Sequence, residues 1–184
     1  MWRKNGGRVM ALDVRKILSG EASKLDVNHS FSLADSGFPF DTQVDGVVFT
    51  KPVSVTGALV NMGGYISLDV TVSAQYDTEC ARCLKPLSRT FETSFSRTVV
   101  RKGELVNTSE EDADEYIEIV DGMLDVETAA AEQLMMEFPM REVCSEECKG
   151  LCFKCGKDLN EGDCDCPKKE IDPRLAILQK LLEK

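Results

Sequence analysis

The chain has 184 residues, of which 42% are hydrophobic and 29% are charged, with a formal net charge of -10. This composition is typical of a soluble globular protein with one domain, or one domain and a small appendage. No stretch approaches the roughly 20 consecutive apolar residues that a membrane helix needs. The first eight residues, MWRKNGGR, are not followed by an apolar run, so the sequence predicts no signal peptide, no membrane partner and a cytoplasmic location.

The clearest secondary structure is predicted in the middle of the chain. Residues 9–50, before it, are too mixed to assign. Apolar residues of one parity over 53–59 lead into the turn sequence Asn-Met-Gly-Gly at 61–64. Apolar and polar residues then alternate over 66–75. This period of two predicts an antiparallel hairpin with one buried face. A third strand is predicted around 91–99, with Phe91, Phe95 and Val99 on the same face.

Helices are predicted only in the second half of the chain. An acidic linker, Glu110–Glu115, and a short strand, Tyr116–Val120, come first. Asp125 then has the properties of an N-cap, and Pro139 ends a helix whose apolar stripe comprises Val126, Ala130, Leu134 and Phe138. A second helix is predicted at the C-terminus, with Asp172 as its N-cap and a leucine-rich face.

These elements predict an α+β fold: an antiparallel β-sheet, open or barrel-like, with a few helices and a Cys-rich zinc-binding C-terminal segment. We expect residues 1–138 to form a mainly β domain with an acidic linker and one helix. Residues 139–184 would add the Cys-rich segment and the last helix, packed on the first part as one unit. The lone His29 lies in a polar stretch, where a surface position is expected.

The charge is distributed unevenly along the chain. From Cys80 to Lys102 there are six basic residues and one acid, whereas from Gly103 to Cys148 there are fifteen acids and one base. The net negative charge opposes long-range attraction to nucleic acid, although the basic strip can still contact phosphate. Charge runs such as these two more often form a solvated surface than a binding site.

Eight cysteines carry the most specific signal in the sequence. They form four closely spaced pairs: Cys80/Cys83, Cys144/Cys148, Cys152/Cys155 and Cys164/Cys166. Cytosolic thiols seldom form stable disulfides, and zinc prefers four soft ligands near a tetrahedron. A C-x-x-C turn aims two thiolates at one point, and Gly156 after one such turn can take the left-handed conformation that eases it. The sequence therefore predicts one or two structural Zn²⁺ ions.

The pairs can be combined in more than one way. The preferred grouping joins Cys152 and Cys155 with Cys164 and Cys166 across a hairpin turning at Asn160-Glu161-Gly162, and leaves the other four thiols for a second site. The alternative is a local cluster of the pairs at 144/148 and 152/155, with the outer pairs sharing the other ion. A single zinc with four spare thiols is the third arrangement.

Enzymatic alternatives fit the sequence less well. A thioredoxin-like motif normally begins a helix after a strand, but Cys83 is followed by Leu84-Lys85-Pro86 and another predicted strand. A metalloenzyme needs an open coordination position and a nearby general base, and His29 is far from the cysteines in sequence. We therefore expect no enzyme and no small-molecule substrate.

The order of these motifs resembles a known family. The motifs are Cys80-Ala81-Arg82-Cys83-Leu84, Cys148–Gly156, Asp158-Leu159-Asn160, Cys164-Asp165-Cys166 and Asp172-Pro173-Arg174-Leu175. Together they span most of the chain and resemble the bacterial YceD family, which contains a large ribosomal RNA subunit accumulation protein. The resemblance implies a cytoplasmic, non-enzymatic factor that supports accumulation of 23S ribosomal RNA and biogenesis of the large ribosomal subunit. It does not imply a molecular action.

Partner contacts are predicted next to the first cysteine pair. Arg82, Lys85 and Arg89 are candidates to bind 23S ribosomal RNA or a protein of the large-subunit precursor, since an arginine fork can hold phosphate through two hydrogen bonds. The acidic linker suits a basic ribosomal protein better than RNA. The alternative function is a generic zinc-stabilised protein-interaction module without a ribosomal role.

Overall fold

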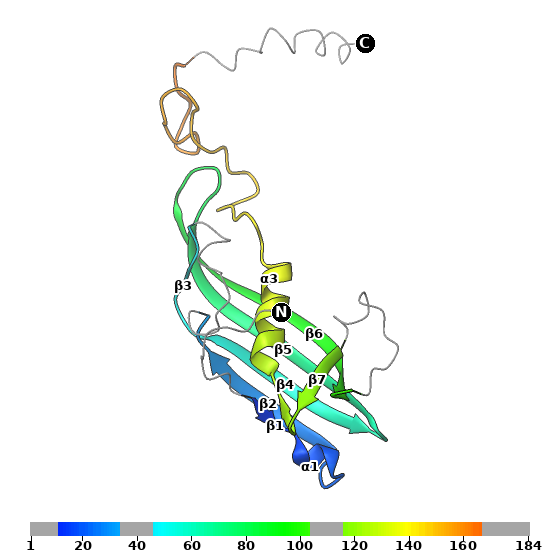
Figure 1. The fold of residues 1–184 in the computed structure, drawn as a ribbon. Coiled ribbons are helices and arrows are strands. Elements are labelled where there is room, and N and C mark those ends of the chain that lie inside the picture. The colour runs from blue at the N-terminus through cyan, green and yellow to red at the C-terminus, as the bar shows by residue number, and fades with distance from the viewer. Residues whose placement is uncertain (1–10, 34–45, 104–115, 167–184) are drawn as a thin grey trace, which may run out of the picture.

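The computed structural model describes residues 11–33, 46–103 and 116–166, and these form one curled sheet with two helices (Figure 1). The sheet has eight strands in the order β1-β8-β7-β6-β5-β4-β2, with β3 paired to β5. The elements are β1 Leu12–Asp13, α1 Arg15–Leu18, β2 Lys24–Phe31, β3 Val48–Phe49, β4 Val53–Met62, β5 Tyr65–Glu79, β6 Pro86–Arg101, β7 Tyr116–Val120, β8 Met123–Leu124 and α3 Val126–Glu137. This architecture confirms the predicted α+β class.

The predicted central hairpin is confirmed as β4 and β5. Its turn is closed by the Asn61 side chain, which accepts a hydrogen bond of 2.9 Å from the Gly64 N–H. Gly63 and Gly64 both have positive φ, which glycine adopts without steric cost. The even-numbered residues of β5 from Ile66 to Tyr76 are buried, as the alternation predicts.

The predicted third strand is β6, which pairs with β5 over nearly its whole length. The register runs from Ile66 opposite Val99 to Glu79 opposite Pro86. This long hairpin extends to one end of the molecule, where its turn carries the first cysteine pair (Figure 1). The Cys-rich segment, which we define as residues 139–166, lies at that same end.

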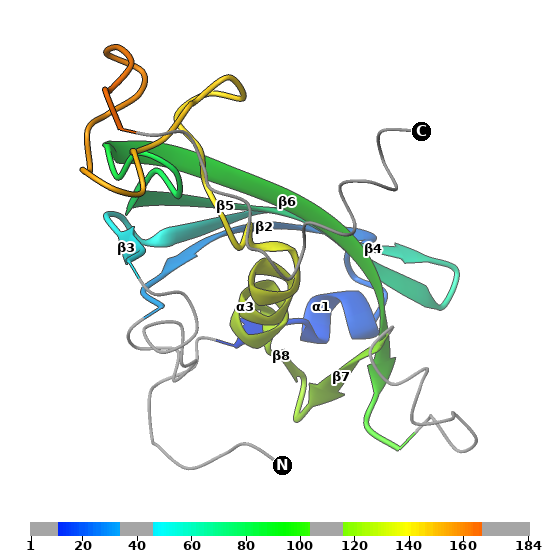
Figure 2. The ribbon, with the colours of Figure 1, turned by 90° about the horizontal axis from the view of Figure 1, so that it is seen from above.

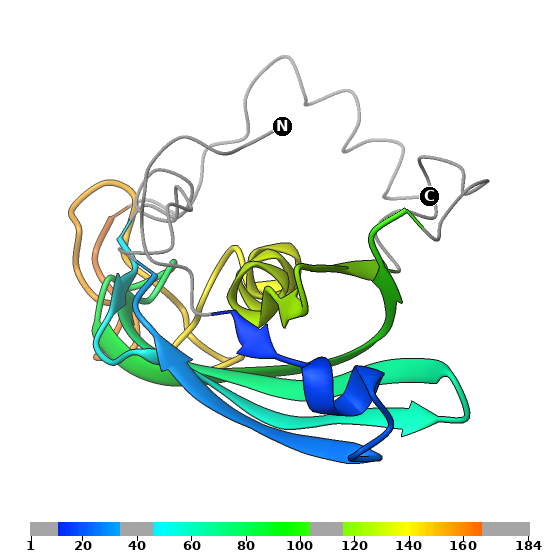
Figure 3. The same cartoon turned by 60° about the horizontal axis from the view of Figure 1, so that its bottom comes forward.

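The sheet curls around α3, which lies on its concave side together with α1 (Figures 2 and 3). Asp125 caps α3 as predicted, since its carboxylate accepts a 3.0 Å hydrogen bond from the Thr128 N–H. Leu134 of the predicted stripe is fully buried. Phe138 ends the helix and packs its ring 4.9 Å from that of Tyr76 on β5. The predicted helix and its buried stripe are therefore confirmed.

Two features of the sheet differ from expectation. β6 and β7 run parallel, with Val99 opposite Ile117, because the connection between them is long enough to return the chain to the same end of the sheet. The expected surface position of His29 is wrong. It shares the inward parity of Val27 on β2, is 22% exposed, and places Nε2 2.5 Å from a carboxylate oxygen of Glu127 on α3.

Several predictions fall outside the described residues. These are the acidic linker at 110–115 and the C-terminal helix from Asp172. The division of the chain after residue 138 also stays a prediction. Within the part of the chain that the structure describes, neither helix has the length and apolar character needed to cross a membrane.

Candidate metal centres

The eight thiols lie in two groups of four, and within each group all sulfur atoms are within 4.8 Å of one another. The grouping agrees with the preferred arrangement from the sequence. We call them the first thiol group (Cys80, Cys83, Cys144 and Cys148) and the second thiol group (Cys152, Cys155, Cys164 and Cys166). The first joins the β5–β6 turn to the chain after α3, whereas the second closes a short loop on itself.

The spacing of the sulfur atoms fits a metal better than disulfides. In the first group, the sulfur of Cys80 is 3.9 Å from that of Cys148, and the sulfur of Cys83 is 3.7 Å from that of Cys144. A tetrahedron with Zn–S bonds of about 2.3 Å has sulfur–sulfur edges of about 3.8 Å. A disulfide would need about 2.05 Å. All eight cysteines are free, so the thiols fit a tetrahedral soft metal ion.

The two C-x-x-C turns have the same backbone hydrogen bonds. The N–H of Cys80 donates to the Lys85 carbonyl at 2.9 Å, and the N–H of Cys152 donates to the Lys157 carbonyl at 2.8 Å. In each turn, the residue after the second cysteine is left-handed and its N–H donates back to the first cysteine. That residue is Gly156 in the second turn, as predicted, but Leu84 in the first, with φ of +58°.

The first thiol group is enclosed more fully than the second. Cys80, Cys83 and Cys148 are buried in a small cluster packed by Leu87, Val143 and Leu151. In the second group only Cys152 is buried, and Cys155 is exposed. Because water competes with ligands for a metal and carries chelators to it, the second group is the more accessible centre.

Neighbouring dipoles and thiols shift the pKa values within each group in opposite directions. Burial raises the pKa of Cys80, but backbone N–H donors outweigh it and lower that pKa to about 6. The backbone N–H groups of its own turn lower the pKa of Cys152 to about 6. In contrast, the adjacent Cys148 and burial raise the pKa of Cys144 to about 12, and a neighbouring thiol with burial does the same for Cys166. A divalent cation at the centre would favour the thiolate form of all four.

Two of the predicted partner contacts attach the β5–β6 turn to the Cys-rich segment. One guanidinium nitrogen of Arg82 donates to the carbonyls of Glu146 and Cys148, both at 2.9 Å. The ammonium of Lys85 lies 3.1 Å from the carboxylate of Asp158. This proximity raises the pKa of Lys85. The backbone N–H of Asn160, which donates to the Asp158 carboxylate, and the Lys85 ammonium together lower the pKa of Asp158.

Arg89 forms part of a second attachment, close to the end of α3. It donates to the carbonyl of Val143 at 3.3 Å, and its Nε is 3.8 Å from the carboxylate of Glu142. The same carboxylate accepts a 2.7 Å hydrogen bond from the Tyr76 hydroxyl, and burial together with this bond raises the pKa of Tyr76. The structure thus gives all three predicted cations intramolecular partners.

The sequence does not reveal the contacts or exposure of three side chains at this end of the molecule. Glu142 links the chain after α3 to β5 and β6. The sequence predicts a turn at Asn160, but it does not predict that the amide of Asn160 contacts the sulfur of Cys148 in the first thiol group. Phe153, at the tip of the second turn, is 69% exposed, with the Lys154 ammonium 5.9 Å from its ring centre. The matching sequences C-A-R-C-L-K and C-F-K-C-G-K would have revealed the equivalent turns.

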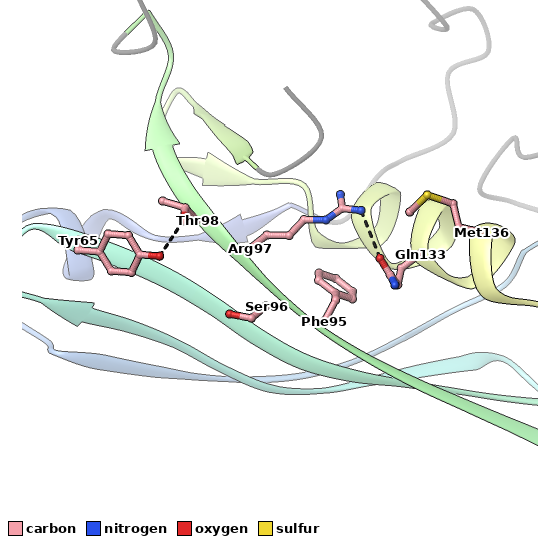
Figure 4. A pocket seen from close by; sticks show the side chains of 7 residues that line it. All are labelled: Tyr65, Phe95, Ser96, Arg97, Thr98, Gln133 and Met136. Atoms are coloured by element: carbon pink, nitrogen blue, oxygen red, sulfur yellow. Dashed lines mark hydrogen bonds between the residues drawn. The ribbon is translucent and has the colours of Figure 1, made fainter. Parts of the chain in front are cut away.

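A hollow of about 360 Å³ lies between β6 and α3. Figure 4 shows Arg97 beside Phe95, with its guanidinium directed toward Gln133 on α3, at 3.5 Å. Arg97 also pairs with Glu132 at 3.5 Å. The carboxylate of Glu132 offsets the positive charge of Arg97, so the hollow is poorly suited to an anionic ligand. The thiol groups are therefore the stronger candidate site.

Comparisons with known proteins connect this arrangement to one family. Residues 68–182 match the family described as Large ribosomal RNA subunit accumulation protein YceD. Uncharacterized protein YlbN of Bacillus subtilis is 30% identical over 156 residues, covering 79% of this chain and 88% of that protein. Uncharacterized protein ML1660 of Mycobacterium leprae is 34% identical over 122 residues, covering 61% of this chain and 51% of that protein.

A plant relative carries a functional name. It is the Large ribosomal RNA subunit accumulation protein YCED homolog 1, chloroplastic, of Arabidopsis thaliana, which is 33% identical over 60 residues. The match covers 33% of this chain and 19% of that protein. No solved structure matches the chain.

Proposed function

Because the chain belongs to the large ribosomal RNA subunit accumulation protein YceD family, we propose that it is a cytoplasmic, non-enzymatic factor that supports accumulation of 23S ribosomal RNA. In this proposal, its two thiol groups each hold one structural Zn²⁺ ion. The partner is the large ribosomal subunit precursor, through 23S ribosomal RNA or a basic ribosomal protein. The family's name supports the ribosomal role, and the chemistry of the thiol groups supports the metal.

The observation that carries the metal part of the proposal is the completeness of both thiol groups. Each offers four sulfur atoms within 4.8 Å of one another. Four protein ligands are typical of structural zinc, whereas catalytic zinc keeps one position open for water or substrate. Zinc in such sites therefore acts on the fold, and in the first thiol group it would hold the Cys-rich segment against the end of the β5–β6 hairpin.

The proposed partner surface lies on the same end of the molecule. Arg82, Lys85 and Arg89 remain proposed contacts, since the side chains of the last two are 49% and 40% exposed. Phe153 and Lys154, at the tip of the second turn, are more accessible. An exposed ring beside a cation can stack on an RNA base or pack on a protein, so these two residues extend the proposed surface.

The test is association of the full-length chain with large-subunit particles in growing cells. A tagged chain should co-sediment with these particles, and sequencing of bound RNA should recover 23S ribosomal RNA. Depletion of the protein should lower 23S relative to 16S ribosomal RNA. A chain that contains zinc but stays at the top of the gradient, with 23S unchanged on depletion, would instead be the generic interaction module.

The contact surface needs variants that leave the metal groups intact. Reversing the charge of Arg82 would also break its two hydrogen bonds to the Cys-rich segment, so a loss of association would be ambiguous. The double variant Phe153→Ala, Lys154→Glu avoids this. It should lower co-sedimentation about tenfold, the effect of losing one contact of about 1–2 kcal/mol. Lys51→Glu, before β4, is the matched control.

A further inference from the structure

One side chain of the second thiol group's loop reaches the first thiol group. Asn160 lies between Cys155 and Cys164, and its amide nitrogen is 3.5 Å from the sulfur of Cys148. Its amide oxygen accepts a 2.8 Å hydrogen bond from the N–H of Lys149, the residue after that cysteine. The Asn160 amide therefore contacts both the sulfur and the following backbone of a first-group thiol.

The position of Asn160 is set by the loop that the second thiol group closes. Its backbone N–H and its side-chain amide both donate to one carboxylate oxygen of Asp158, at 2.8 and 2.7 Å. Leu159 donates to the carbonyl of Gly150 at 2.9 Å. Asp158 and Leu159 follow the second C-x-x-C turn directly. Their geometry therefore depends on that turn being held by its metal.

We infer that Asn160 is a positioning residue that couples the two thiol groups, so that metal bound in one raises the metal affinity of the other. The inference rests on the proposed binding of metal by both groups. An N–H donor to a thiolate sulfur stabilises the charged ligand and fixes its direction, as hydrogen bonds to metal ligands generally do. Equilibrium coupling is reciprocal, so the two affinities must change by the same factor.

Other contacts between the two groups are weaker candidates for this role. The Lys85–Asp158 ion pair spans them, but its ammonium is 49% exposed, and exposed ion pairs contribute little. The Leu151 N–H donates to the Arg82 carbonyl at 3.0 Å, but it contacts no sulfur. Asn160 is the described side chain that joins the second group's loop directly to a first-group ligand.

The test is titration of the metal-free, full-length chain with Co²⁺, whose bond to thiolate gives a charge-transfer absorption band. The affinity of the first thiol group is measured with the second intact and with the second removed by Cys155→Ser and Cys166→Ser. Removal should weaken the first group roughly tenfold, in the range found when a hydrogen bond to a metal ligand is lost. Removing the first group by Cys83→Ser and Cys144→Ser should weaken the second by the same factor.

Substitution of Asn160 should abolish this coupling. In Asn160→Ala, two Co²⁺ ions should still bind, but removing either thiol group should no longer change the Co²⁺ affinity of the other. Asn160→Asp keeps an acceptor for the Lys149 N–H but loses the amide donor to the sulfur and to the Asp158 carboxylate, so it should also uncouple the groups even if the alanine variant folds poorly. Glu161→Ala, in the same turn, is the control and should keep the coupling.

The outcomes separate this inference from the proposed function. Undiminished coupling in both Asn160 variants, or independent affinities in the unaltered chain, would overturn the inference while leaving two metal sites in place. A chain that binds no Co²⁺ would remove the metal part of the proposed function and this inference with it.

Discussion

Replacing Gly150 by alanine tests how closely the two cysteine turns approach each other. Gly150 has φ of +74°, and a Cβ atom there would lie 2.8 Å from the carbonyl oxygen of Arg82. The left-handed conformation costs an L-residue about 1–2 kcal/mol. The contact with a backbone oxygen adds about 1–3 kcal/mol, as overpacking usually does. We expect the Cys-rich segment to lose about 2–5 kcal/mol of stability.

Gly156→Ala is the matched control, because the two glycines share nearly the same φ but differ in what a Cβ atom would meet. Gly156 has nearly the same φ, +73°, but a Cβ atom there would meet nothing within 4 Å. It should therefore lose only the conformational term of about 1–2 kcal/mol. The difference between the two variants isolates the approach of the second turn to the first.

The measurement is urea unfolding of the Co²⁺-loaded chain at one fixed Co²⁺ concentration, followed by the charge-transfer band. With a slope of about 2 kcal/mol/M, a difference of about 2 kcal/mol separates the two midpoints by about 1 M. Coincident midpoints would mean that the Arg82 carbonyl does not lie against Gly150 in solution. The close packing of the turns would then be wrong.

Four further predictions address the metal, the core and the first turn. Chelation should expose the thiols to disulfide reagents while far-UV circular dichroism retains most of its sheet signal; full unfolding, or no response, would contradict this. Zinc affinity should fall as the pH is lowered from 8 to 6, by on the order of tenfold per pH unit for each proton that binding releases. The reason is that Cys144, with a pKa of about 12, must lose its proton to bind the metal. Competition with a chelator at each pH measures the zinc affinity. Leu84→Gly should stabilise the chain by up to about 1 kcal/mol in urea, since glycine relieves the positive φ. Leu134→Ala should cost about 3–5 kcal/mol in the same assay, whereas Met136→Ala, 66% exposed, should change stability by less than about 0.5 kcal/mol.

The central hairpin and α3 could be predicted because their signals are local. Alternation along β5 is visible in ten consecutive residues, and the cap at Asp125 precedes its helix directly. β2 has the same alternation, but His29 stands at an inward position where an apolar residue would continue the pattern. Only pairing with β4, far along the chain, and the Glu127 carboxylate on α3 explain that strand.

The grouping of the thiols was accessible from the sequence, whereas the role of the neighbouring cations was not. The spacing of the last four cysteines is short enough to predict their closure into one loop. Arg82, Lys85 and Arg89 show only charge in the sequence, and the groups that they contact come more than 50 residues later. Sequence order places no side chain beside a carbonyl at that distance.

The first turn lacks the glycine that marks the left-handed position in the second turn. Leu84 occupies the left-handed position that Gly156 fills in the equivalent turn. Turn prediction relies on glycine to mark positive φ, so a leucine there gives no signal. In this conformation the Leu84 N–H donates to the Cys80 carbonyl at 2.9 Å, as the Gly156 N–H does to the Cys152 carbonyl.

The separation of the first group's ligands along the chain has a consequence for biosynthesis. Its sulfur contacts join residues 61 and 68 positions apart. At roughly 5–20 residues per second, the first two thiols leave the ribosome about 3–14 seconds before their partners. During that interval an incomplete pair is open to oxidation and to soft ions such as Cu(I). The second group is synthesised within about three seconds. Errors of metal loading in the newly made chain should therefore concentrate at the end of the β5–β6 hairpin.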